Sequence, residues 1–175
     1  QKNLLAHNGI SEKTMGVPIR SSMDVSEVGI TKRNVPVYLD RQAANSDALV
    51  IINRIKTHTK FEGDIESGLF KMMAIGMGKH QGASVYHRAA VDHGMEAIII
   101  DAGLMVLERC PVLFGLGVVE NGLGRITELK AIAAPAIIGL RRYPVKGNNA
   151  PAAIGMARTL YPNAQKRFWR IVRMV

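Results

Sequence analysis

The sequence predicts an α/β domain whose sheet is at least partly parallel and carries flanking helices. Apolar runs at 35–39 (VPVYL), 48–52 (ALVII) and 112–119 (VLFGLGVV) are typical of strands, and a continuous run such as 48–52 is typical of a buried parallel strand. Segments with helical spacing separate these runs. Strands that alternate with helices indicate a Rossmann-like sheet in which helices join parallel strands.

The remaining elements follow from local signals. A polar turn at 31–34 precedes the first run, and a loop at 53–63 follows the second, at the carboxyl end where open α/β sheets place their ligands. Ser67 is expected to cap the helix at 67–77. Further helices are predicted at 41–47, 83–95 and 104–110, and a strand at 97–100 (AIII). Repeated prolines after Leu129 leave no predicted sheet element there.

The bulk composition is typical of a soluble globular domain. The chain has 175 residues, of which 47% are hydrophobic and 21% charged. No apolar run approaches the roughly 18 residues of a membrane span, so no membrane partner is predicted. A lone cysteine, Cys110, excludes an internal disulfide and indicates a reducing, cytoplasmic compartment.

The net charge of +9 is concentrated at one end. Nine of the 23 Lys and Arg residues, and none of the 14 acidic residues, lie at 129–175. We therefore divide the chain into an α/β domain at 1–129 and a basic tail at 130–175. A dense basic cluster is the footprint of a nucleic-acid or lipid site, but the charges are scattered except at 166–173, which disfavours nucleic acid.

Three nitrogen-bearing side chains mark the candidate site. His58 follows the strand at 48–52, where an imidazole can act as a general base or simply bond a loop carbonyl. Lys71 lies in an apolar stretch, where it is either an inward-facing nucleophile or a surface lysine. His87 follows sixteen residues later. The acidic residues next to His58 either orient its imidazole or solvate a turn; they are Glu62, Asp64 and Glu66.

Two common sites are disfavoured by spacing. His87 and His93 are six residues apart, so they fall on different faces of a helix, whereas paired zinc ligands favour a spacing of four. The glycines at 76, 78 and 82 are one residue too widely spaced for the dinucleotide fingerprint, and no strand directly precedes them.

Three segments of the chain are specific enough to indicate a family: VGITKRNVPVYLD, DALVIINRIKTHTKFEGDIESGLFKMMAIGMGKHQGA and VLFGLGVVEN. Through them residues 9–129 resemble the N-terminal domain of the nickel-pincer nucleotide-dependent lactate racemase family, and most closely its uncharacterised members. The resemblance implies an enzyme that racemises or epimerises a 2-hydroxy acid by hydride transfer through a lysine-tethered nickel-pincer nucleotide. It also implies an incomplete N-terminal domain, whose site a C-terminal domain or another chain completes.

The resemblance assigns a role to each matching residue. Lys71 resembles the cofactor tether, His87 the nickel ligand and His58 one of two acid/base histidines. Ser67 and Gly68 resemble the pair that approaches the cofactor. One departure is clear, because the second acid/base histidine is expected near 20–24, where the sequence reads RSSMD. Racemisation needs a proton acceptor on each face of the carbon, so this absence leaves a non-catalytic cofactor- or metal-binding module as the alternative. Polyanion binding by the tail is the third hypothesis.

Overall fold

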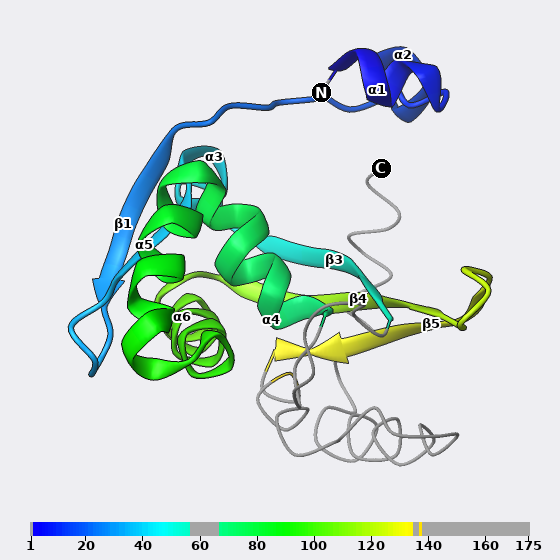
Figure 1. Ribbon diagram of the computed structural model, residues 1–175. Coiled ribbons are helices and arrows are strands. Elements are labelled where there is room, and N and C mark those ends of the chain that lie inside the picture. The colour runs from blue at the N-terminus through cyan, green and yellow to red at the C-terminus, as the bar shows by residue number, and fades with distance from the viewer. Residues whose placement is uncertain (1, 57–66, 135–136, 138–175) are drawn as a thin grey trace.

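The computed structural model describes residues 2–56, 67–134 and 137 (Figure 1). Its helices are α1 (Lys2–His7), α2 (Glu12–Met15), α3 (Arg41–Ala44), α4 (Leu69–Lys71), the π-helix η1 (Met72–Gly76), α5 (Met77–His93) and α6 (Met95–Arg109). Its strands are β1 (Val25–Ile30), β2 (Pro36–Asp40), β3 (Leu49–Ile55), β4 (Val112–Glu120) and β5 (Ile126–Ala133).

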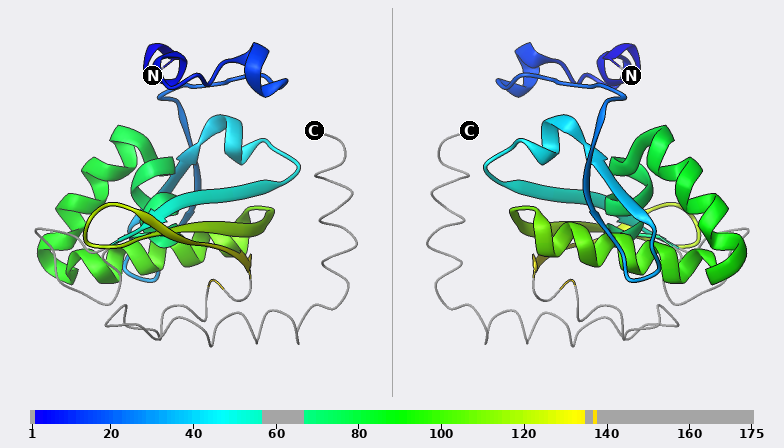
Figure 2. Two further views of the ribbon diagram at one scale, coloured as in Figure 1. Left: turned by 90° about the vertical axis from the view of Figure 1, so that its right-hand side faces the viewer. Right: turned by 90° about the vertical axis from the view of Figure 1, so that its left-hand side faces the viewer.

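The strands form two sheets. In the larger sheet the order is β3-β4-β5, with β3 parallel to β4 and β4 antiparallel to β5. The helices α4, η1, α5 and α6 connect the two parallel strands. The smaller sheet is the antiparallel β1–β2 hairpin, which lies beside α5 and α6 (Figures 1 and 2). The prediction of a partly parallel sheet with flanking helices is therefore confirmed.

The core joins the helices to both sheets. Alternate residues of β2, Val37 and Leu39, are fully buried, as a strand with one face against the core requires. On α5 the side chain of Tyr86 is fully buried, and its hydroxyl oxygen accepts a hydrogen bond of 3.0 Å from the backbone N–H of Tyr38. This bond and the ion pair between Lys79 and Asp40 at 3.0 Å tie α5 to β2 across a largely apolar interface.

The strand predicted at 97–100 is wrong, because these residues form the first half of α6. A short apolar run cannot by itself distinguish a strand from a buried helix. The deciding signal is the wider pattern, in which the buried residues recur at helical spacing through Ile98, Ile99, Ala102 and Val106.

The prediction that no sheet element follows Leu129 is also wrong. β5 continues to Ala133, pairs with β4 and crosses the predicted domain boundary at 129/130. Three further boundaries shift: β3 extends to Ile55, the helix predicted at 83–95 begins at Met77, and the helix predicted at 104–110 begins at Met95. The strand β1 has no counterpart among the predicted elements. In β1 a bulge between Glu27 and Gly29 interrupts the alternation that identifies a strand.

Across the two long described stretches, 2–56 and 67–134, no helix combines the length and the apolarity that crossing a bilayer demands.

Candidate functional site

The carboxyl end of β3 is tied to the start of α4 by two polar side chains. The N–H of Lys56 donates to Ser67 Oγ at 2.8 Å, and the Ser67 hydroxyl donates to the carbonyl of Lys56 at 2.6 Å. Nearby, Asn53 Nδ2 donates to the carbonyl of Gly68 at 2.9 Å. These bonds fix the end of β3 against Ser67 and Gly68, the two residues that precede α4.

Ser67 does not cap the helix, contrary to prediction. The N-cap is Gly68, which makes no side-chain capping bond, and the Ser67 hydroxyl bonds Lys56 instead. Gly68 is buried, with φ +91° and ψ −155°, a backbone conformation that is open essentially to glycine alone. The Ser-Gly pair therefore has a structural task here, and its role in binding a cofactor stays a prediction.

Glycines seat α4 tightly against its neighbours. A Cβ added at Gly115 of β4 would lie 2.3 Å from Leu69 Cδ1, and one added at Gly103 of α6 would lie 2.3 Å from Phe70 Cδ1. Leu69 thus packs on the sheet and Phe70 on α6. Lys71 follows about 200° around the helix from Leu69, so the half-buried lysine faces away from β4.

A bend separates α4 and η1 from most of α5. Lys79 has φ 55° and ψ −157°, far from helical values, and its ammonium pairs with Asp40 Oδ2 at 3.0 Å. Burial alone would raise the pKa of Asp40. The hydrogen bond from Lys79, those from the N–H groups of Ala43 and Gln42, and the ammonium charge outweigh burial and lower that pKa.

His87 lies on the exposed side of α5, directly after the fully buried Tyr86. Among the described residues, no hydrogen bond or ion pair engages its imidazole. His80 and His93, on the same helix, are exposed as well. Within the described ranges no three His, Cys, Asp or Glu side chains form a cluster that could hold a metal ion.

The structure brings together some of the predicted site residues. Ser67, Gly68 and Lys71 share the turn that opens α4, whereas His87 lies beyond the bend. α4 packs chiefly on α6, η1 and β3, and α5 packs chiefly on β2, α6 and η1. His58 lies outside the described residues, as do Glu62, Asp64 and Glu66. Convergence of His58, Lys71 and His87 on one ligand therefore stays a prediction.

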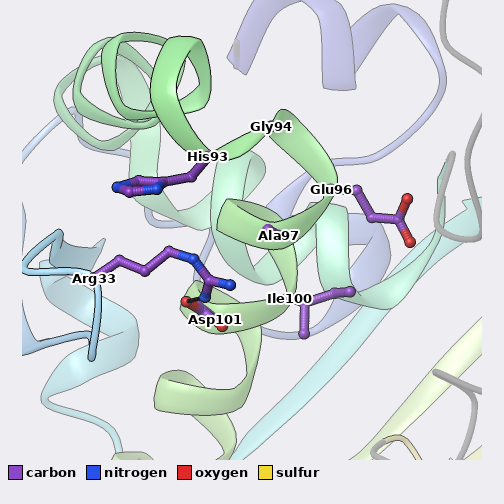
Figure 3. A pocket seen from close by; sticks show the side chains of 7 residues that line it. All are labelled: Arg33, His93, Gly94, Glu96, Ala97, Ile100 and Asp101. Carbon is purple, nitrogen blue, oxygen red and sulfur yellow. Dashed lines mark hydrogen bonds and ion pairs between the residues drawn. The ribbon is translucent and has the colours of Figure 1, made fainter.

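A separate pocket of about 400 Å³ lies where the β1–β2 turn meets the start of α6 (Figure 3). Its charged lining mixes signs, with Arg33 ion-paired to Asp101, and with His93 and Glu96 nearby. It contains no residue of α4 or β3. No local sequence pattern predicts this pocket, because Arg33 and Asp101 are 68 residues apart.

Neither a protein-family model nor a curated protein sequence matches this chain.

Proposed function

We propose that this chain belongs to a nickel-pincer nucleotide-dependent racemase or epimerase of 2-hydroxy acids, with a Rossmann-like fold. The observation that carries the proposal is the placement of Lys71. It stands on a helix fixed by close glycine contacts, immediately after the Gly68 turn at the carboxyl end of a parallel strand. Open α/β sheets bind ligands at this end.

The donor groups suit such a cofactor chemically. A lysine amine supplies the nitrogen for a covalent tether, and the exposed imidazole of His87, without a partner in the described part of the chain, is a suitable nickel ligand. When bound, the group would supply a hydride acceptor. His58 would take the proton from the substrate hydroxyl, and Ser67 and Gly68 would line the tether.

A non-catalytic module that binds the same cofactor is the second candidate. The observation in its favour is the segment 20–24, which precedes β1 and contains no histidine. Such a module would carry the adduct and the metal without changing the configuration of any 2-hydroxy acid.

The test begins with the chain produced together with the cofactor-synthesis enzymes. Intact mass should reveal an adduct, peptide mapping should place it on Lys71, and elemental analysis should find nickel. Lys71→Ala should abolish both signals. His87→Ala should keep the adduct but lose nickel, whereas the matched control His93→Ala, another exposed histidine of α5, should keep both. An unmodified mass without nickel in the parent protein would contradict both candidates.

A chiral assay on a panel of 2-hydroxy acids then separates the two candidates. Turnover that disappears with His58→Ala supports the enzyme, and a loaded but inert protein supports the binding module.

A further inference from the structure

The bend at Lys79 is costly for the backbone. A lysine with φ 55° and ψ −157° occupies a region that is essentially restricted to glycine, so its backbone is strained. The other described non-glycine residue with positive φ is Asn34, in the β1–β2 turn, where asparagine is well tolerated. Strain at Lys79 persists only because surrounding contacts hold it.

An enclosed ion pair holds this bend. The Lys79 and Asp40 side chains are 19% and 14% exposed, whereas Arg109 and Glu108, which pair at 3.9 Å, are 61% and 68% exposed. The other carboxylate oxygen of Asp40 accepts the N–H groups of Gln42 and Ala43 at 2.9 and 3.1 Å. These two bonds fix the carboxylate at the end of β2 independently of Lys79.

Gly78, just before Lys79, and Gly82, three residues after it, let the main chain at the bend lie close to Tyr86 of α5 and to β2. A Cβ at Gly78 would lie 3.2 Å from Tyr86 Cε2 and 3.4 Å from the carbonyl of Tyr38. A Cβ at Gly82 would lie 3.1 Å from the same ring atom. Because Gly78 and Gly82 have no side chains, the main chain at the bend can lie close to Tyr86 and β2, where Lys79 reaches Asp40.

The bend matters because of the distance along the chain between Lys71 and His87. In a straight helix, residues sixteen apart would have Cα atoms about 24 Å apart, a span that these two side chains cannot bridge around one metal. The chain instead changes direction between α4 and α5 (Figure 1). A common ligand for Lys71 and His87 requires this change of direction.

We propose that Asp40 and Lys79 are positioning residues that fix the bend between the helix carrying Lys71 and the helix carrying His87. This inference rests on the proposed function, since it concerns how the tether and the nickel ligand reach one group. In this role neither residue would contact the cofactor itself. Their ion pair sets the angle between η1 and the part of α5 that follows Lys79.

The first test needs no cofactor. Spin labels are attached at Val50→Cys on β3 and Arg88→Cys on α5, both exposed, in the full chain with Cys110→Ala. Lys79→Met removes the ammonium, and Asp40→Asn removes the charge while keeping an oxygen for the α3 cap. Either change should broaden or shift the inter-label distance distribution. Lys79→Arg should restore it, and Arg109→Ala, which breaks the exposed Arg109–Glu108 ion pair, should leave it unchanged.

The second test uses protein produced with the cofactor-synthesis enzymes. Lys79→Met and Asp40→Asn should keep the adduct on Lys71 but hold nickel about tenfold more weakly or worse, as loss of an orienting partner does at metal sites. Lys79→Arg should recover nickel binding. A variant that merely unfolds would lose its circular dichroism and its adduct together.

The outcomes separate the two hypotheses. An unchanged distance distribution, or unchanged nickel retention in both variants, overturns the positioning role while leaving the proposed function intact. A parent protein with neither adduct nor nickel overturns the proposed function and the positioning role with it, even where the spin labels show that the bend depends on the ion pair.

Discussion

Replacing Gly103 with alanine should loosen the contact that seats α4, the helix that carries Lys71. The added methyl group would fall 2.3 Å from Cδ1 and 2.9 Å from Cε1 of the Phe70 ring. Phe70 is only 4% exposed and belongs to the core, so its ring cannot swing aside without displacing its neighbours. The strain must therefore move α4 relative to α6.

The expected cost follows from two opposing effects. Overpacking of a core typically costs about 1–3 kcal/mol, and a contact this short belongs at the upper end, about 3 kcal/mol. Alanine gains about 1 kcal/mol over glycine inside a helix. The free energy of unfolding of the full chain should thus fall by about 2 kcal/mol, which urea titration followed by circular dichroism measures.

A matched glycine and a double-mutant cycle sharpen this prediction. At Gly76, exposed in η1, an added Cβ meets the flexible end of Met72, so Gly76→Ala should be neutral or stabilise by up to about 1 kcal/mol. In a Phe70→Leu background the ring is gone, and Gly103→Ala should cost about 2 kcal/mol less. The reasoning is refuted if Gly103→Ala costs no more than Gly76→Ala, or costs the same in both backgrounds.

Three further predictions concern stability. Ile51 and Ile52 are adjacent on β3 but 2% and 55% exposed, so urea titration should find a loss of about 3 kcal/mol for Ile51→Ala and less than about 1 kcal/mol for Ile52→Ala. Tyr86→Phe should cost about 1–2 kcal/mol in the same assay, because the N–H of Tyr38 loses its acceptor. The pKa of Asp40 lies below its ordinary value of 3.8, so its contribution to stability is complete above that pH and disappears as the pH falls through the lower folded-state value. An Asp40→Asn chain should therefore show a flatter decline in stability below about pH 4.

The sequence predicts the position of a strand well where its apolar run is long. β3 and β4 read as continuous apolar runs, so their positions are predicted to within a few residues. The prediction that the run at 48–52 is a fully buried strand is wrong, because Val50 and Ile52 are 40% and 55% exposed and only one face of β3 packs on the core. Ala97–Ile100 was misassigned because four apolar residues suit a strand and a buried helix equally. β5 carries an alternation of burial through Glu128, Lys130 and Ile132, but the prolines that follow it argued against a sheet there.

The sequence predicts which residues belong to the candidate site, but not how the backbone arranges them. Lys71 and His87 stand out because an amine and an imidazole recur around glycine-rich turns, and the burial of Tyr86 explains why its neighbour His87 faces outward. The sequence does not reveal that Ser67 bonds Lys56 rather than capping a helix. It also does not reveal the bend, since a lysine such as Lys79 is not expected in a backbone conformation that favours glycine.

Glycines determine how closely the helices of the candidate site pack, which the spacing of Lys71 and His87 along the chain does not indicate. Gly103 and Gly115 fix how closely α4 approaches α6 and β4, and Gly78 and Gly82 fix how closely the corner of α5 approaches the Tyr86 ring. At each position a side chain would have to displace a neighbour. Glycine-rich stretches are usually taken as flexible turns or phosphate loops, but here the absence of side chains makes the contacts closer. The same residues that weaken local helix propensity therefore determine where the helix bearing Lys71 lies.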